Sequence, residues 1–197
     1  MVFGSQQRIG RNSPGHPPNK WLIGALLWAV MLGAANGQKV SFPGSRSETK
    51  SPDGRYIVRN ADDEKQEPAH TLTLIDAKSG SAIRSYSYGR HVDVLWSPNS
   101  SAFVVNDYEG SDASHPVLFT APWANQPIDL REKLIGFLRS GRGAKSVQDN
   151  HHVYFSAQRW LSGGEIVCQV TGYGEVDPKG FSAQYVYKIG VGFRARP

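Results

Sequence analysis

The sequence predicts an all-β, mostly antiparallel protein with three blade-like sheets, arranged as an incomplete propeller or a sandwich, and one inserted amphipathic helix. A turn that leads into a short apolar strand occurs three times, at Ser51-Pro52, Ser97-Pro98 and Leu161-Ser162. Trp96 and Trp160 stand directly before the second and third copies, so we expect both in the core. The order strand, turn, strand, polar loop, strand recurs at the period of roughly 40–45 residues that a four-stranded blade requires. An ordinary β-sandwich with similar hairpins is the alternative fold.

Residues 1–37 have the features of a signal peptide. Basic residues precede the uncharged run Trp21–Ala35, and small residues follow it as far as Gly37. A basic region, a short apolar region and a small-residue cleavage site are typical of a secretory leader. The run is shorter than the roughly 20 residues that a membrane-spanning helix needs, and an uncleaved N-terminal anchor is the alternative. We therefore expect export, to the periplasm or outside the cell.

Composition then limits the classes of function. The leader contains three of the 22 Lys and Arg residues and none of the 17 Asp and Glu residues, so the rest of the chain has a net charge of only +2. This small charge argues against a nucleic-acid partner. A single cysteine, Cys168, cannot form an internal disulfide, and its place in an apolar run predicts a buried structural thiol. Residues 38–197 are enough for one domain held together by packing.

The first unit is expected at about 48–88. Ser51–Gly54 reads as a tight turn, because proline presets φ, aspartate bonds its own backbone and glycine accepts positive φ. A strand at Arg55–Asn60 follows. After a polar loop, Leu72 and Leu74 alternate with threonines, which is the pattern of a half-buried strand.

The second and third units are expected at about 89–128 and 150–197. In "RHVDVLW" the residues Val92, Val94 and Trp96 share one face of a strand. In "AQYVYKIG" near the end of the chain, two tyrosines and an isoleucine alternate with polar residues in the same way. Residues 38–49 read as a linker or a first edge strand.

An amphipathic helix is expected at 129–141, inserted between the second and third units. Asp129 is placed to cap its N-terminus, with Glu132 three residues on, and Gly141 is placed to end it. The polar stretch 140–150 is expected as a loop. The apolar residues that share one helical face are Leu130, Leu134, Phe137 and Leu138.

The stretches "SPDGRYIV", "LWSPNSSAFVVND" and "LTLIDAKSG" resemble the repeats of TolB-like (WD40-related) β-propellers. The resemblance covers Lys50 to Asp107, and extends loosely to "RWLSGGEIVCQV", where the proline and aspartate of the turn are absent. It implies blade-like units in a scaffold or binding platform, and it implies no particular activity. Closed propellers use four to eight blades. Three units would therefore stack as an open wedge, or two chains would complete one ring as a homodimer.

Acidic and aromatic residues in the polar loops give the candidate binding site. Equivalent loops of a repeat gather at one end of the structure, and exposed aromatic side chains among polar groups mark binding surfaces. We expect this surface to bind a protein or a component of the cell envelope without catalysis, and we expect no cofactor. The candidate residues are Tyr108, Glu109, Asp112, Tyr173 and Glu175.

Two other classes of function remain open. The first is a metal-dependent or hydrolytic enzyme centred on His115, His151 and His152. Adjacent histidines on a strand point to opposite faces, and no Gly-x-Ser-x-Gly elbow supports Ser111, Asp112 and His115 as a triad. Alternating oxygen ligands in "NDYEGSDASH" would suit calcium, but the spacing is not that of an EF-hand. The second class is a subunit of an envelope assembly that pairs an open sheet edge with a partner strand.

Overall fold

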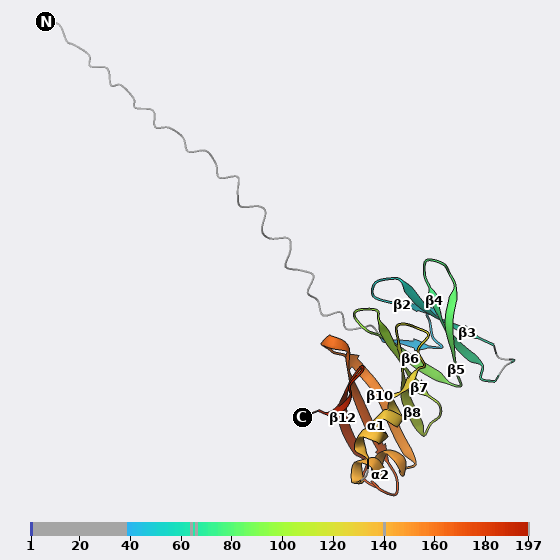
Figure 1. The fold of residues 1–197 in the computed structure, drawn as a ribbon, viewed down its shortest axis with the longest axis vertical. Coiled ribbons are helices and arrows are strands. Elements are labelled where there is room, and N and C mark those ends of the chain that lie inside the picture. The colour runs from blue at the N-terminus through green and yellow to red at the C-terminus, as the bar shows by residue number, and fades with distance from the viewer. Residues whose placement is uncertain (2–38, 64, 66, 140, 197) are drawn as a thin grey trace. The chain divides into compact units, whose positions relative to one another are not determined.

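A computed structural model describes residue 1 and residues 39–196 except 64, 66 and 140 (Figure 1). The predicted signal peptide or anchor at 1–37 lies outside these residues, apart from Met1. Residues Ala35–Pro197 form one compact unit. Within its described part, the chain folds into two β-sheets and two short α-helices. No helix of this part is both long and apolar enough to cross a membrane.

The smaller sheet coincides with the first predicted unit. Four antiparallel strands follow one another as hairpins in the order β2-β3-β4-β5. Leu72 and Leu74 are buried, whereas Thr71 and Thr73 lie on the other face, opposite Ser87 and Ser85 on β5, as the alternation predicted. The strands are β2 (Glu48–Lys50), β3 (Tyr56–Asp62), β4 (His70–Asp76) and β5 (Ala82–Tyr88).

The larger sheet has nine strands. Its order is β1-β6-β7-β8-β10-β11-β12-β13, with β9 paired to β8, and all neighbours are antiparallel except β8 and β10. The segment expected as a linker or edge strand thus supplies β1 to this sheet and β2 to the other. The strands are β1 (Lys39–Phe42), β6 (His91–Trp96), β7 (Ala102–Tyr108), β8 (Ala113–Thr120), β9 (Ile128–Asp129), β10 (His152–Trp160), β11 (Glu165–Tyr173), β12 (Phe181–Lys188) and β13 (Gly192–Ala195).

The prediction of three separate sheets is wrong in number, because the second and third units share one sheet. The chain leaves the end of β8, passes through two helices and returns to the start of β8, so β10 begins beside β8 and runs parallel to it. Their pairing covers only two positions, Val153 with Ala113 and Tyr154 with Ser114. Both sheets are open among the described strands, with β2 and β5 at the edges of one and β1 and β13 at the edges of the other.

Strands β6, β7 and β8 form a layer with a hydrophobic core on each face. On one face Val92, Val94 and Trp96 pack with the smaller sheet, as their shared face predicted. On the other face Leu95 packs with β10, β11 and the helices, in a cluster that includes Trp160. Both tryptophans are buried, as predicted. This double burial explains why every residue of β6 after His91 is buried.

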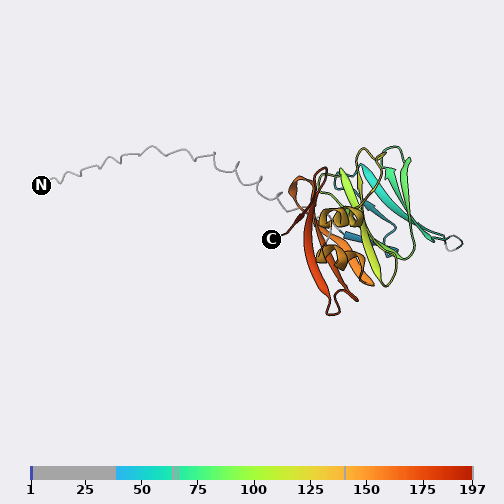
Figure 2. The same cartoon turned by 60° about the horizontal axis from the view of Figure 1, so that its bottom comes forward.

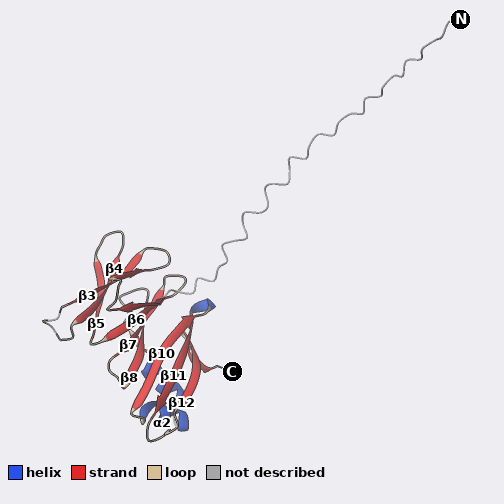
Figure 3. Ribbon diagram, turned by 180° about the vertical axis from the view of Figure 1, so that it is seen from behind, coloured by secondary structure: helices blue, strands red, loops and turns tan. Residues whose placement is uncertain are grey.

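The two helices lie on one face of the β10–β12 strands (Figures 2 and 3). Helix α1 (Leu130–Leu138) is capped as predicted, because the Asp129 carboxylate accepts the N–H groups of Arg131 and Glu132 at 2.7 and 3.1 Å. The helix ends at Arg139, which has a φ of +56°, rather than at Gly141. Helix α2 (Arg142–Gln148) occupies the stretch predicted as a loop, and its Ala144 and Val147 are buried.

Candidate functional site

Three stacked His–Tyr pairs lie at the end of the fold that carries the connections 63–69, 109–112 and 174–180, called here the loop end. Each histidine is the direct cross-strand neighbour of its tyrosine at a strand terminus. The smaller sheet contains one pair and the larger sheet two. The ring centroids are 5.0 Å apart in His70–Tyr88, 4.2 Å in His91–Tyr108 and 4.4 Å in His152–Tyr173. Such pairs bury ring area and fix the strand ends on which the loops stand.

Contacts across the β8–β10 junction hold the 109–112 connection. The Asp112 carboxylate lies 3.3 Å from His152 Nδ1, and the backbone oxygen of Asp112 accepts the N–H of Val153 at 3.0 Å. The hydroxyl of Tyr154 donates to the backbone oxygen of Ser111 at 2.7 Å. These contacts link a loop of the second unit to the first strand of the third.

The 174–180 connection is held by a buried amide. The Asn150 side-chain oxygen accepts the N–H groups of Val176 and Asp177, and its amide nitrogen donates to the Asp177 carboxylate at 3.0 Å. Arg142 from α2 donates to the other oxygen of that carboxylate at 2.9 Å. Hydrogen bonds from Ser146, Arg142 and Asn150 lower the pKa of Asp177. The loop is thereby fixed to the helix beside it.

Three of the five predicted binding residues are exposed on these two loops or at the end of the strand beside them. Tyr173 rests one face on His152 and is 49% exposed. Asp112 approaches Nδ1 of the same His152 ring, and Glu175 lies 3.4 Å from the exposed His151. The exposed side chains of Asp112, Tyr173 and Glu175 are called the loop-end surface below.

The other two predicted residues lie elsewhere. Glu109 is exposed in the same connection as Asp112 and lies 3.7 Å from His115. Tyr108 is partly buried, because its ring stacks on His91 and its hydroxyl donates to Asp93 at 2.9 Å. Its phenol is thus engaged within the fold rather than presented with Tyr173.

Two buried carboxylates in the central layer were not among the predicted residues. Asp93 is 2% exposed and receives hydrogen bonds from Lys39, Ser41 and Tyr108. Burial raises the pKa of Asp93, but those hydrogen bonds outweigh it and the net shift is downward. In the sequence, an acid between Val92 and Val94 has the position of a solvent-facing residue on a half-buried strand. That alternation does not identify Asp93 as buried, because β6 is covered on both faces.

Asp107, the second buried carboxylate, is only half satisfied. It is 4% exposed, and its Oδ2 accepts the hydroxyl of Tyr86 at 2.6 Å. Its Oδ1 is buried and has no hydrogen-bond partner among the described residues. Burial raises the pKa of Asp107 as well as that of Tyr86. This pair connects the two sheets at the loop end.

The histidines of the enzymatic alternative are dispersed among different pairs. His151 lies near Glu175, His152 near Asp112, and His115 near Glu109. Ser111 donates to Asp112 rather than to a histidine. Within the described part of the chain, no group of three or more His, Cys, Asp or Glu side chains could hold a metal ion. Cys168 is fully buried, and burial raises the pKa of its thiol.

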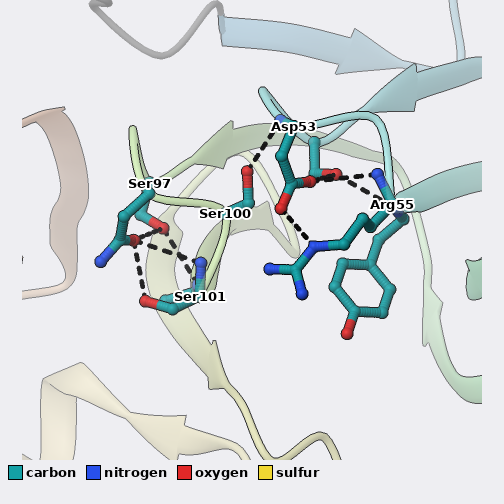
Figure 4. A network of polar contacts seen from close by, with 9 residues as sticks. Asp53, Arg55, Ser97, Ser100 and Ser101 are labelled. Atoms are coloured by element: carbon teal, nitrogen blue, oxygen red, sulfur yellow. Dashed lines mark hydrogen bonds and ion pairs between the residues drawn. The ribbon is translucent and has the colours of Figure 1, made fainter.

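The opposite end of the fold, called the turn end, carries the repeated turns 51–55, 97–101 and 161–164. In the first two turns the serine hydroxyl accepts the N–H five residues on, Ser51 from Tyr56 and Ser97 from Ala102, at 3.0 Å each. Neighbouring turns are joined where the N–H of Asp53 donates to Ser100 Oγ at 3.0 Å (Figure 4).

The Asp53 carboxylate satisfies its own turn. It accepts hydrogen bonds from the Ser51 hydroxyl and from the N–H and guanidinium of Arg55 (Figure 4). Burial opposes them, yet these bonds hold the pKa of Asp53 well below its usual range. Together with the bond from Asp53 to Ser100, this network connects the first two units at their turns.

Comparison of the chain with models of protein families and with curated proteins gives no significant match.

Proposed function

We propose that this chain is an exported, non-catalytic binding or scaffold domain. Its two open sheets pack on each other, and the loop-end surface contacts a protein or a component of the cell envelope. The observation that carries this proposal is that Asp112, Tyr173 and Glu175 are exposed on or beside two loops that hydrogen bonds hold in place.

Rigidity of the loops supports binding as the function of this surface. A side chain that is ordered before binding loses less conformational entropy when a partner arrives. Tyr173 is held by His152, and the loop that carries Glu175 is held by Asn150 and Arg142. Tyrosine combines a large apolar ring with a hydroxyl and has only two side-chain torsions, so it is enriched at protein interfaces.

The two exposed carboxylates determine what kind of partner fits. Asp112 and Glu175 offer acceptors for a lysine or arginine side chain. A partner with a basic residue beside an apolar one would satisfy both the acids and the exposed ring. The partner class that we propose is therefore a protein or envelope component with a basic contact segment.

Site-specific photo-cross-linking in the producing cell tests this function. A photo-reactive phenylalanine analogue replaces Tyr173 in one strain and Ser79 in another, since Ser79 is exposed in the β4–β5 turn at the turn end. We expect light to produce an adduct of discrete mass from position 173 and none from position 79. Adding Asp112→Lys and Glu175→Lys should abolish that adduct. Equal adducts from both positions, or an adduct that survives the charge reversals, would contradict the proposal.

A further inference from the structure

The β12–β13 hairpin presents an apolar side chain to solvent at the turn end. Val191 is 79% exposed, the largest exposure of any large apolar residue after Met1 in the described chain. It stands between Gly190 and Gly192, whose φ angles of +77° and +120° make a turn that side chains rarely permit. A Cβ atom added at either glycine would meet nothing within 4 Å. The space beside both glycines is therefore open, and Val191 projects into solvent.

Helix α1 supplies an aromatic ring and a cation beside this tip. Phe137 is 42% exposed, and together with Lys133, Tyr187 and Phe193 it lines a cleft of about 420 Å³ with the hairpin. No carboxylate of the described residues pairs with Lys133 or with Lys188, which precedes the tip. An apolar projection with unpaired lysines around it is what an interfacial membrane contact requires.

A series of contacts between neighbouring strands places Lys39 at the turn end, near the β12–β13 hairpin tip. Lys39, the first residue of β1, is paired with Leu95, whose carbonyl oxygen accepts the indole N–H of Trp160 at 3.1 Å. The turn after Trp160 ends at Gly164, whose carbonyl accepts the N–H of Ile189 at 3.2 Å. Ile189 leads directly into the hairpin tip.

The sequence that precedes β1 indicates what covers this end. Only three residues separate the uncharged run Trp21–Ala35 from Lys39. A run of this kind enters a membrane, as a leader during export or as a retained anchor. If the run is retained as an anchor, it tethers the body at the end that carries Lys39 and the hairpin tip.

The charged residues beside the hairpin tip differ in sign from those of the loop-end surface. The connections 161–164 and 189–191 contain no charged residue, and Glu165 next to them is paired with Arg194. The exposed acids of the candidate site, Asp112 and Glu175, lie at the opposite end, on the loop-end surface. An anionic surface would thus meet lysines beside the hairpin tip and carboxylates at the loop-end surface.

We propose that the turn end rests on the surface of an anionic phospholipid bilayer. Val191 and Phe137 enter the boundary between headgroups and acyl chains, and Lys133 and Lys188 contact lipid phosphates. The loop-end surface then faces away from the membrane, toward its partner. This inference shares the export part of the proposed function, but it does not require that the loop-end surface binds a partner.

A fluorescent label at the tip tests the contact directly. Residues 38–197 contain both hydrophobic cores and lack the apolar run, so they bind only through the folded surface. In Val191→Cys an environment-sensitive label attaches at position 191, since Cys168 is fully buried. Lys179→Cys is the control, because Lys179 is exposed in the 174–180 connection at the loop end. Vesicles of phosphatidylglycerol should shift the emission of the label at 191 to the blue and leave the label at 179 unchanged. Equal shifts at both positions, or no shift at 191 at low ionic strength, would overturn the proposal.

Charge reversal tests the role of the lysines by vesicle co-sedimentation. Lys133→Glu and Lys188→Glu should each weaken binding to phosphatidylglycerol vesicles by at least about fivefold, because a lysine near an anionic surface contributes about 1 kcal/mol and the glutamate is also repelled. Binding should also fall as salt is added. Lys179→Glu, in the 174–180 connection at the loop end, is the control and should leave binding unchanged. The same loss in the control, or equal binding to phosphatidylcholine vesicles, would show general attraction and contradict a defined membrane-facing end.

Discussion

The side chain of Asn106 replaces a β-strand as the hydrogen-bond partner of Ala157. Its amide nitrogen donates to the carbonyl oxygen of Ala157 at 2.9 Å, and its oxygen accepts the N–H of Ala157 at 2.8 Å. Strand β10 pairs with β8 only as far as Tyr154, and its pairing with β11 is irregular just after Ala157. The backbone of β10 would therefore lack partners at this point, and Asn106 supplies both of them from β7.

Truncation of this side chain should destabilise the domain strongly. Asn106→Ala leaves the buried N–H and C=O of Ala157 unpaired, and each unsatisfied group costs about 1–3 kcal/mol. We expect a loss of about 2–4 kcal/mol in the free energy of unfolding, measured by urea denaturation. Gln158→Ala removes an exposed amide from the same strand and should change stability by less than about 0.5 kcal/mol. Similar losses in the two variants would contradict this role of Asn106.

Removing the charge of Asp93 should reduce stability at neutral pH but not in acid. The folded pKa of this carboxyl is lowered, so its contribution is complete above the unfolded pKa of about 3.9 and disappears as the pH falls through the folded pKa. Asp93→Asn should therefore be less stable than the parent at pH 7, and the difference should shrink below about pH 3. Unfolding free energies across this range provide the measurement. A constant difference at all pH values would show that the hydrogen bonds, and not the charge, stabilise the site.

Asp107 should show the opposite pH dependence. Its folded pKa is raised, so the folded state favours the protonated acid, and the associated stability is lost as the pH rises through the folded pKa. Asp107→Asn keeps an acceptor for Tyr86 and cannot ionise. Its stability relative to the parent should thus increase from about pH 4 to about pH 7. Parallel pH profiles for the two proteins would refute a raised pKa.

Two matched substitutions separate a hydrogen bond from packing at the buried tryptophans. The indole N–H of Trp160 bonds to Leu95, whereas that of Trp96 has no partner among the described residues. Trp160→Phe and Trp96→Phe remove the same atoms. We expect the variant at 160 to lose about 1 kcal/mol more, because only it leaves a carbonyl without its donor. Equal losses in thermal or urea unfolding would mean that packing alone matters at both positions.

A methyl group at Gly172 should disturb the loop end selectively. A Cβ there would lie within 3 Å of the backbone oxygen of His152 and of the Phe181 ring. Gly172→Ala should cost about 1–3 kcal/mol. It should also shift the NMR resonances of Tyr173, its neighbour on the loop-end surface. Gly136→Ala in α1 is the control, since nothing lies within 4 Å of the added atom, and it should stabilise the helix by up to about 1 kcal/mol. Unchanged resonances of Tyr173 would separate this glycine from the site.

The parts of the fold that the sequence predicted are those that local chemistry determines. The Ser51–Gly54 turn, the alternation around Leu72 and the Asp129 cap each depend on residues close together in the chain. Helix α2 was missed because its Gly143 and Ser146 are poor helix formers, and it is held instead by the burial of its neighbours against β11. The parallel pairing of β8 with β10 depends on where two helices return the chain, which periodicity does not encode.

In the candidate site, too, the sequence predicted the residues whose position depends on local chemistry and not those placed by long-range contacts. Tyr173 and Glu175 were found because they are an aromatic and an acid in a polar loop. The inward position of Tyr108 follows from its stack on His91 and its bond to Asp93, which are long-range contacts. Asp93 and Asp107 were missed for a related reason, since both faces of their strands are covered by units distant in the sequence.

The pairing of β1 with β6 imposes an order on the assembly of the domain during synthesis. Lys39 and Asp93, which join the two strands, are 54 residues apart, and the whole of the smaller sheet is encoded between them. As the chain emerges from its N-terminus, β1 has no partner until the first unit has been made, whereas the hairpins of that unit can close at once. Because loop closure over a shorter contour is less costly, the smaller sheet should form before β1 docks. The last step for the newly made N-terminal part is therefore the docking of β1 on β6. In this step Lys39 binds the carboxylate of Asp93, which is synthesised after the smaller sheet.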